Sequence, residues 1–376
     1  MKILFTGGGT GGHFYPIIAV AEAVREQSRV RKTVTPKLYY MAPDPYNSQK
    51  LLENNIEFVR VPAGKIRRYF SFLNVTDMFK TLAGCFKALI KMYLIYPDVV
   101  FGKGGYGSFP ALLSARILNI PVVIHESDSK PGRVNAWAGK FARRIALSYP
   151  EAAKYFKHLD RIAYTGNPIR REIAEPTTNG AEELLNLESQ TPVVLILGGS
   201  QGSQMINDVI MAVLPELLNG YQVIHQTGRT NIDEIKTTSA EVLKNHQYSY
   251  RYHPFEYLDE LALRMSAGLA KVIVSRAGST IFEIAAWGRP SIIIPLPNTV
   301  SHAQTNNALA YSRTGAASLI EENNLTAHVL LSEIERIVKT PAVSEMMSGE
   351  ARNFARLDSA TVIADTIIDL ALEHEK

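Results

Sequence analysis

The sequence predicts an α/β protein of two lobes, each built on a parallel β-sheet. Apolar runs of strand length alternate with helical stretches and short turns, a pattern typical of parallel sheets covered on both faces. The two halves open alike, since KILFTGGGTGGH and VVLILGGSQGSQ are each an apolar strand, a glycine-rich turn and a helix start. We therefore expect two Rossmann-like parallel-sheet lobes facing a cleft, with ligands beyond the carboxyl ends of the strands.

The alternation is interrupted once, by the polar segment 172–191, which we interpret as a linker or as a loop with a short helix. Before it we expect strands at Lys2–Thr6, Leu38–Met41, Phe58–Val61, Val99–Phe101 and Val122–His125, and helices at Phe14–Gln27, Asn74–Leu94, Ser108–Leu118 and Val134–Phe141. After it we expect strands at Val193–Leu197, Gln222–His225, Lys271–Ser275, Ser291–Pro295 and Ala317–Ile320, and helices at Gln204–Leu218, Thr280–Ala286, Ala303–Ser312, Ala327–Lys339 and Ser359–Glu373.

Composition is that of a soluble globular protein. At 376 residues the chain is too long for one ordinary core, and 46% of it is hydrophobic and 20% charged. A single cysteine, Cys85, excludes an internal disulfide and favours a reducing compartment. The start MKILFTGGG lacks the long apolar core of a signal peptide, and no apolar run approaches a spanning helix. We therefore expect the chain to stay in the compartment where it is made.

Positive charge is concentrated in two stretches. Between Arg60 and Met92 seven basic residues face one acid, Asp77, and Ser129–Pro150 holds five basic residues and no acid. In the first stretch Lys65, Arg67 and Arg68 alternate with aromatic side chains that include Phe70 and Phe72. Basic residues that border an apolar face suit an anionic lipid surface. The alternatives are a core-packed helix with a solvated basic side, or a nucleic-acid site, which we disfavour because no nucleic-acid module is visible.

The first glycine turn, Gly7–Gly12, follows a strand and precedes a helix. Its glycines allow a tight turn and a close approach to a ligand, and the free N–H groups of the next helix favour an anion. One alternative is a plain strand–helix turn. Another is dinucleotide binding, which requires an acid about 20 residues further on; the nearest, Asp44, lies 32 residues after Gly12.

Two further turns of this kind lie in the second half. Gly198–Ser203 is either a second anion site or a turn in which Ser203 caps the helix. Ser275–Thr280 is followed by Glu283, which suits a diphosphate at the helix start with a ribose diol on the carboxylate. A capping box explains the same residues without a ligand.

His13 stands at the mouth of the first turn, where an imidazole can act as a general base. His125, Glu126 and Asp128 end a strand in the same half and supply further acid–base groups. No metal-ligand spacing is visible, so we expect no obligatory protein-bound metal, with helix dipoles and Arg170 neutralising a departing diphosphate.

Together these motifs resemble the MurG family, the glycosyltransferases that convert the undecaprenyl-diphosphate muramyl-pentapeptide, lipid I, into lipid II in peptidoglycan synthesis. The resemblance covers nearly the whole chain. It rests on GGGTGGHFYP, GKGGYGSFPA, IPVVIHESD, KPG, NAWAGKFA, TGNPIR, LGGSQGSQMIND, HQTG, SRAGSTIFEIAAWGRPSIIIPLP and HAQTNNA. It implies a fold of the GT-B type, with an N-terminal acceptor and membrane-binding lobe at 1–166, a C-terminal UDP-sugar lobe at 167–356, and a last helix at 357–376 that returns to the first lobe.

The resemblance also implies roles for individual residues. The donor UDP-N-acetylglucosamine would be bound by Thr10, Gly11, Gly12, Asp128, Arg170, Ser200, Leu258, Ser279, Thr280, Glu283 and Gln304. The acceptor site would be shaped by Gly104, Gly105, Tyr106 and His125, with His13 or Glu126 as the catalytic base. Membrane contact would fall on Lys65, Arg67, Arg68, Phe70 and Phe72.

The activity implied is an inverting transfer of N-acetylglucosamine to the muramyl 4-hydroxyl without a cofactor. We expect a peripheral enzyme on the cytoplasmic face of the cell membrane, with roles in cell shape and cell division, and with other cell-wall synthesis proteins as partners. The alternatives are a transferase for another membrane lipid such as diacylglycerol, and a non-catalytic nucleotide-sugar-binding protein.

Overall fold

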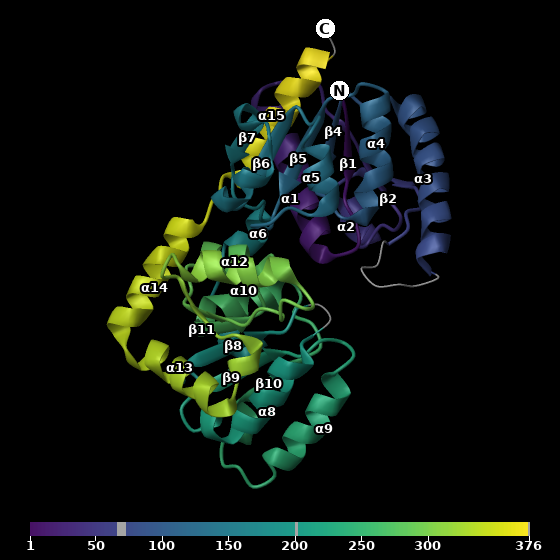
Figure 1. Ribbon diagram of the computed structural model, residues 1–376. Coiled ribbons are helices and arrows are strands. Elements are labelled where there is room, and N and C mark those ends of the chain that lie inside the picture. The colour runs from purple at the N-terminus through teal and green to yellow at the C-terminus, as the bar shows by residue number, and fades with distance from the viewer. Residues whose placement is uncertain (66–72, 200–201, 375–376) are drawn as a thin grey trace. The chain divides into compact units, whose positions relative to one another are not determined.

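The structure is a computed structural model that describes residues 1–65, 73–199 and 202–374. Its internal contacts divide the chain into two compact units, Met1–Arg170 with Arg356–Lys376, and Arg171–Ala355. Each unit is a parallel sheet with helices on both faces (Figure 1). The predicted α/β class, with two Rossmann-like lobes, is confirmed.

The sheet of the first unit has the order β3-β2-β1-β4-β5-β6-β7, and each recorded pairing is parallel. The order reverses between β1 and β4, where a doubly wound sheet opens a crevice at its carboxyl edge. The strands are β1 (Lys2–Thr6), β2 (Lys37–Ala42), β3 (Ile56–Arg60), β4 (Val99–Gly102), β5 (Val122–Glu126), β6 (Arg144–Leu147) and β7 (Ile162–Tyr164).

Alternate residues of these strands point to opposite faces, so that Ile3 and Phe5 enter one core while Leu4 enters the other. The Ile3 side is covered by α1 (Gly11–Val30) and α15 (Ser359–His374), and also contains Leu51 of α2 (Ser48–Glu53). The Leu4 side is covered by α3 (Leu73–Ile95), α4 (Phe109–Ile117) and α5 (Arg133–Ala138). Short 3₁₀ turns lie at η1 (Tyr106–Ser108), η2 (Pro150–Tyr155) and η3 (Leu159–Arg161).

The last helix, α15, belongs to the first unit although 185 residues of the second unit precede it (Arg171–Ala355). Its apolar side, which includes Ile363, Ile367 and Ile368, packs into the core beside α1. Ser359 Oγ donates to the Gly166 carbonyl at 3.0 Å, and Arg31 pairs with Asp369 at 2.5 Å. The helix therefore completes one face of the sheet.

The second unit repeats the plan with the order β10-β9-β8-β11-β12-β13, again with parallel pairings. Its strands are β8 (Val193–Leu197), β9 (Gln222–Gln226), β10 (Tyr252–Phe255), β11 (Ala270–Ser275), β12 (Ser291–Ile293) and β13 (Ala317–Leu319). Its helices are α6 (Arg171–Ala174), α7 (Ala181–Leu184), α8 (Gln204–Leu218), α9 (Ile232–Val242), α10 (Glu260–Leu269), α11 (Thr280–Ala286), α12 (His302–Ser312), α13 (Ala327–Lys339) and α14 (Pro341–Phe354), with 3₁₀ turns η4 (Ser249–Arg251) and η5 (Glu322–Asn324).

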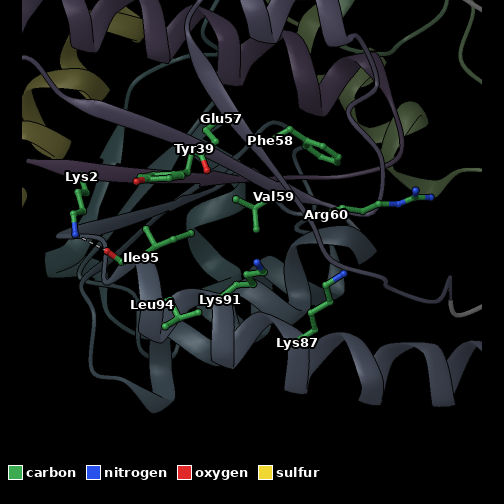
Figure 2. Close-up of a pocket in the computed structure, with 10 residues that line it drawn as sticks. All are labelled: Lys2, Tyr39, Glu57, Phe58, Val59, Arg60, Lys87, Lys91, Leu94 and Ile95. Atoms are coloured by element: carbon green, nitrogen blue, oxygen red, sulfur yellow. Dashed lines mark hydrogen bonds between the residues drawn. The ribbon is translucent and has the colours of Figure 1, made fainter.

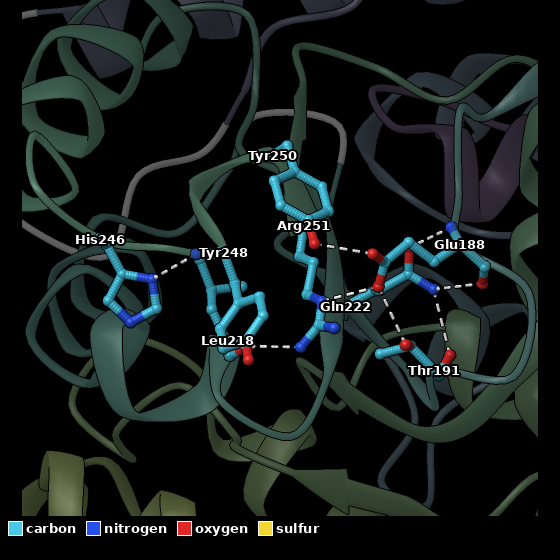
Figure 3. Close-up of polar contacts among 8 residues, drawn as sticks. All are labelled: Glu188, Thr191, Leu218, Gln222, His246, Tyr248, Tyr250 and Arg251. Carbon is cyan, nitrogen blue, oxygen red and sulfur yellow. Dashed lines mark hydrogen bonds and ion pairs between the residues drawn. The ribbon is translucent and has the colours of Figure 1, made fainter.

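The polar segment after residue 172 is more ordered than a plain linker. It holds two short helices, α6 and α7, and its end is fastened by Glu188 (Figure 3). The Glu188 carboxylate accepts from Arg251 Nε at 2.7 Å and from the Tyr250 hydroxyl at 2.7 Å. Its backbone exchanges two hydrogen bonds with the Gln222 side chain. These bonds fasten the entry to β8 onto β9 and onto η4, the turn before β10.

Several elements were not expected from the sequence. Strands β6, β7 and β10 are short, and β7 and β10 are sheet edges, where burial is partial and apolar periodicity is weak. Pro254 within β10 is tolerated at such an edge. Strand β3 begins at Ile56 rather than at the expected Phe58, because its second residue, Glu57, is an exposed edge residue. Helices α2, α9, α10 and α14 were also missed.

Candidate active site

The β1–α1 turn and the β4–η1 turn pack directly on each other at the point where the strand order reverses. A Cβ on Gly8 would lie 2.8 Å from the Gly107 Cα, and one on Gly9 (φ +87°) would lie 2.9 Å from Tyr106 Cε1. Gly104 and Gly105 also have positive φ, 87° and 80°. Glycine is therefore required at these positions because the backbones of the two turns approach each other closely, whether or not a ligand binds there.

His13 lies in the first turn of α1 and is half-buried. Its Nδ1 is 3.1 Å from Thr10 Oγ1, and its ring also bonds to the Gly8 backbone. Burial, together with the charge of Lys103, lowers the pKa of His13 to about 4, against an opposing effect of Asp128. The imidazole is therefore neutral at pH 7, which is the form that can accept a proton.

Glu126 ends β5, and its carboxylate closes the loop that follows. It accepts from the Asp128 N–H at 2.9 Å, the Gly132 N–H at 3.0 Å and Asn135 Nδ2 at 3.0 Å. Burial, then the neighbouring Asp128, raises the pKa of Glu126 to about 7. Both oxygens are thus engaged in holding the loop from Glu126 to Gly132.

His125 is completely buried and lies behind the site surface. Its Nε2 donates to the Gly166 carbonyl at 2.9 Å, and Ser148 Oγ is 3.3 Å from the same nitrogen. Its carbonyl accepts from Asn135 Nδ2 at 2.9 Å, which links β5 to α5. His125 therefore holds β5 to its neighbours through hydrogen bonds, and its buried side chain is not at the surface of the site.

Lys103, which follows β4, is a residue that the sequence analysis missed. Its side chain is 1% exposed, and Nζ donates to Asn167 Oδ1 at 3.3 Å. Burial lowers the pKa of Lys103 to about 8, although Glu126 and Asp128 favour its charged form. The sequence pattern that could have pointed to Lys103 is its position in GKGGYG, directly after an apolar strand. We did not select it because most lysines in proteins are exposed to solvent.

Arg170 ends the first segment of this unit, and its guanidinium lies 4.2 Å from the ring centroid of Tyr15 on α1. The first unit therefore gathers most of the predicted N-terminal residues at the carboxyl ends of three neighbouring strands. These are Thr10, Gly11, Gly12 and His13 after β1, Gly104, Gly105 and Tyr106 after β4, and His125, Glu126 and Asp128 at and after β5.

In the second unit the glycine turn after β8 is organised by Gln226, another residue that the sequence analysis did not single out. Gln226 Nε2 donates to the Gly199 carbonyl at 3.1 Å, and Oε1 accepts from the Leu258 N–H at 3.0 Å. Gly199 has φ +84°, and a Cβ there would meet nothing within 4 Å. Gln226 thus joins this turn to the backbone of Leu258, whose side chain is buried. Ser200, predicted at the nucleotide, falls outside the described residues.

The turn before α11 is not capped by a side chain. Ser279 is the N-cap residue in αR geometry and makes no capping hydrogen bond, so a capping box does not account for this motif. A Cβ on Gly278 would meet nothing within 4 Å, which leaves open space beside the turn. Thr280 begins the helix and Glu283, half-buried, lies in its first turn.

Arg276 and Gln304 support this edge of the second sheet. Arg276 Nε donates to Ser203 Oγ at 3.0 Å, and its Nη2 pairs with Glu322 at 2.5 Å. Gln304, in the first turn of α12, accepts from the Leu296 N–H at 3.1 Å. The predicted residues Leu258, Ser279, Thr280, Glu283 and Gln304 thus follow strands β10, β11 and β12 at the carboxyl edge of one sheet.

The α3 helix carries a row of exposed apolar side chains. Phe79, Leu82, Phe86, Ile90 and Tyr93 recur at helical spacing and are between 46% and 70% exposed. Lys80, Lys87 and Lys91 follow one border of that row. Lys65 is exposed, whereas Arg67, Arg68, Phe70 and Phe72 lie outside the described residues.

A groove of about 430 Å³ lies between α3 and the edge of the sheet (Figure 2). Lys87 and Lys91 line it together with Tyr39 and Val59, and Lys2 Nζ closes one end by donating to the Ile95 carbonyl at 2.8 Å. This face of the first unit therefore combines apolar and positively charged side chains.

Within 1–65, 73–199 and 202–374 no helix is long and apolar enough to cross a bilayer. In those same ranges no three His, Cys, Asp or Glu side chains group as metal ligands would.

Solved structures share this architecture over nearly its full length. The chain resembles MurG of Acinetobacter baumannii with a TM-score of 0.72 at 24% identity, covering 98% of this chain and 99% of that one. It also resembles the MnaA protein of S. aureus solved with UDP, with a TM-score of 0.69 at 15% identity, covering 100% and 98%. Two Rossmann-like units with glycine-rich turns at their carboxyl edges define the two-lobe GT-B class of fold.

Sequence comparison narrows this class. Residues 3–147 match the glycosyltransferase family 28 N-terminal domain, and residues 193–363 match the C-terminal domain of the same family. The chain belongs to glycosyltransferase family 28 and, within it, to the MurG family.

Two relatives carry the same descriptive name, UDP-N-acetylglucosamine–N-acetylmuramyl-(pentapeptide) pyrophosphoryl-undecaprenol N-acetylglucosamine transferase. One, from Treponema denticola, is 33% identical over 375 residues, covering 95% of this chain and 93% of its own. The other, from Legionella pneumophila strain Paris, is 35% identical over 341 residues, covering 90% and 89%.

Proposed function

We propose that this protein transfers N-acetylglucosamine from UDP-N-acetylglucosamine to the 4-hydroxyl of the lipid I muramyl-pentapeptide, yielding lipid II and UDP. The observation that carries the proposal is the 33% identity over 95% of the chain to the Treponema denticola transferase of that name. The glycine turns at the carboxyl edges of both sheets are consistent with a phosphorylated donor and a phosphorylated acceptor.

The transfer is a single displacement with inversion. The acceptor oxygen attacks the anomeric carbon as the bond to the UDP oxygen breaks, and the hydroxyl proton passes to a base. His13 is our candidate because its imidazole is neutral at pH 7 and lies beside the two packed glycine turns. In the second unit, the uncapped turn at Ser279 and Thr280 would bind the diphosphate, and Glu283 would bind the ribose hydroxyls.

No metal ion enters this scheme. The leaving diphosphate would be neutralised by backbone N–H groups, and Arg170 would add a positive charge. Metal independence is therefore part of the proposal, and EDTA tests it.

The deciding experiment is transfer of radiolabel from UDP-N-acetylglucosamine to a short-chain lipid I analogue, with and without EDTA. We expect label in the lipid fraction in both conditions, a loss of about 10²-fold or more in His13→Ala, and full activity in the control His328→Ala, an exposed histidine on α13. If the label entered diacylglycerol instead, the acceptor would be that lipid and not lipid I. Donor binding without transfer to either lipid would indicate a non-catalytic binding protein.

We also propose that the α3 face attaches the enzyme to an anionic bilayer, which would place it on the cytoplasmic face of the cell membrane. The exposed Phe79–Tyr93 row would enter the interface, with the neighbouring lysines near lipid phosphates. Each lysine adds about 1 kcal/mol near such a surface. A lipid-linked acceptor gives this attachment a purpose, because its diphosphate stays in the headgroup region.

Flotation with vesicles of phosphatidylglycerol tests this attachment. Leu82→Ser/Phe86→Ser is expected to lose most vesicle binding while keeping transfer to a water-soluble acceptor analogue. The control Leu52→Ser/Leu184→Ser removes exposed leucines from α2 and α7 and is expected to bind normally. Equal binding by both double variants would refute the proposed surface.

A further inference from the structure

Lys103 places a positive charge inside the first unit, and it has no ion pair within 4 Å among the described residues. The residue is 1% exposed, and its Nζ donates to the uncharged Asn167 amide. A buried charge is costly unless it is paired. Packing gives no reason for this cost, since a methionine of similar length would fill the same space.

The charge lies next to the candidate base. A Cβ added to Gly7 would be 3.5 Å from Lys103 Cβ and 3.7 Å from His13 Cβ, so the two side chains leave from either side of one glycine. The Lys103 N–H donates to the Thr6 carbonyl at 2.9 Å, which fixes the start of this residue against β1. The Lys103 backbone is thereby held at the same carboxyl edge of the sheet as His13.

Titratable groups from three neighbouring parts of the first unit act on this pair. α1 contributes His13, β5 contributes His125 and Glu126, and the loop after β5 contributes Asp128. The positive charge of Lys103 lowers the pKa of both histidines, and Asp128 opposes it at His13. The pKa of Lys103 itself, lowered by burial to about 8, leaves it charged at pH 7.

We propose that Lys103 is a positioning residue for the transfer reaction, whose buried ammonium, held by Asn167 beside the β1–α1 turn, opposes protonation of the neighbouring His13 imidazole. This assignment deepens the proposed function and rests on it for its catalytic meaning. Lys103 acts through His13 and does not touch the reacting atoms. Burial already favours the neutral imidazole, and the charge of Lys103 extends the neutral form to more acidic pH.

The sign of the effect follows from the charges. Removing the ammonium removes a repulsion from the imidazolium, so the pKa of His13 rises, and a larger fraction of enzyme holds a protonated base at mildly acidic pH. Removing the Asp128 carboxylate has the opposite effect, because that carboxylate favours the imidazolium.

The test is an NMR titration of ¹³C-labelled histidine in the full-length protein, with the His13 signal assigned by its loss in His13→Gln. In Lys103→Met we expect the pKa of His13 to rise by about one pH unit or more, the usual effect of one nearby charge. Lys103→Arg is expected to restore the value of the natural protein. The surface control Lys140→Met, an exposed lysine after α5, is expected to leave it unchanged.

Lys103→Gln supplies a second variant that removes the charge and keeps a polar group opposite Asn167. A rise in the pKa of His13 there supports the assignment even if Lys103→Met fails to fold. An unchanged value in either variant, when it is folded, would overturn the assignment.

Transferase kinetics then connect the titration to catalysis. The acidic limb of kcat/KM against pH is expected to move upward in Lys103→Met and to return in Lys103→Arg. The titration needs no substrate. If the pKa of His13 shifted in a protein without transferase activity, the proposed function would be wrong and the electrostatic coupling of Lys103 to His13 would still hold. An unshifted pKa in an active enzyme would reject the coupling alone.

Discussion

The close packing of the two glycine turns makes Gly8→Ala a sharp test of how the N-terminal site is built. The added Cβ would lie 2.8 Å from the Gly107 Cα and 2.9 Å from the Gly107 N, both backbone atoms that cannot rotate away. Ordinary carbon contacts are about 3.5–4.0 Å. One turn must therefore move by several tenths of an ångström or more.

Overpacking of this kind costs about 1–3 kcal/mol. For a unit of this size each kcal/mol lowers the thermal midpoint by roughly 2–4 °C. Catalysis is expected to fall further, because a displacement of about 1 Å near reacting groups can cost 10²-fold in rate. We expect Gly8→Ala to remain folded, to unfold at lower temperature and to lose most of its kcat/KM.

The matched control is Gly220→Ala, at a turn after α8 where a Cβ would meet nothing within 4 Å. Thermal unfolding followed by circular dichroism and transfer to the lipid I analogue are measured on both variants. If Gly8→Ala matched Gly220→Ala in both measurements, the inference that glycine is required for this turn–turn contact would be wrong.

Three further predictions concern the second unit. Gly349→Ala, inside α14 where a Cβ meets nothing within 4 Å, is expected to stabilise the protein by about 0.4–1 kcal/mol, measured by urea unfolding; destabilisation would contradict the open space assigned there. Gln226→Leu breaks the bonds to Gly199 and Leu258 and is expected to weaken UDP binding about tenfold by calorimetry. The control Gln247→Leu, at an exposed position before η4, is expected to leave UDP binding unchanged, and equal affinities of the two variants would show that Gln226 does not position the UDP site. The Tyr250 hydrogen bond, followed by contacts from Thr191 and Arg251, lowers the pKa of Glu188, so its stabilising contribution is present above the ordinary glutamate pKa and lost as pH falls through the lowered value. Glu188→Gln is therefore expected to narrow the difference between thermal midpoints at neutral and acidic pH, and an unchanged difference would count against this network.

Buried strands and strongly amphipathic helices were predictable from the sequence. The β1 and β8 strands, and helices α8, α11 and α13, have the bounds that apolar periodicity and capping residues predict. The edge strands β7 and β10 were not predictable, because they are short and only partly buried. Helix α9 has few apolar residues among many polar ones, so that its buried residues Ile232 and Ile235 gave too weak a pattern to predict a helix.

The glycine turns were predictable as well, because five glycines in six residues directly after a strand are typical of a tight strand–helix turn that backbone or ligand approaches closely. The burial and the hydrogen-bond partners of the side chains around those turns could not be predicted from the sequence. His13 and His125 both offer acid–base groups in the sequence, yet one borders the turns while the other is completely buried. Lys103, Gln226 and Arg276 were overlooked because their partners, such as Asn167 and Leu258, are distant in sequence and become visible only in three dimensions.

The return of α15 to the first unit has a consequence for biosynthesis. Synthesis at about 5–20 residues per second leaves roughly 10–40 s between completion of the first 170 residues and emergence of α15. During that time the face of α1 that receives Ile363, Ile367 and Ile368 has no cover from its own chain. The second unit is contiguous in sequence and can fold on the ribosome during this time. The first unit is therefore synthesised first but completes its fold last. Until then, the uncovered apolar face of α1 is the surface that a nascent-chain chaperone would bind.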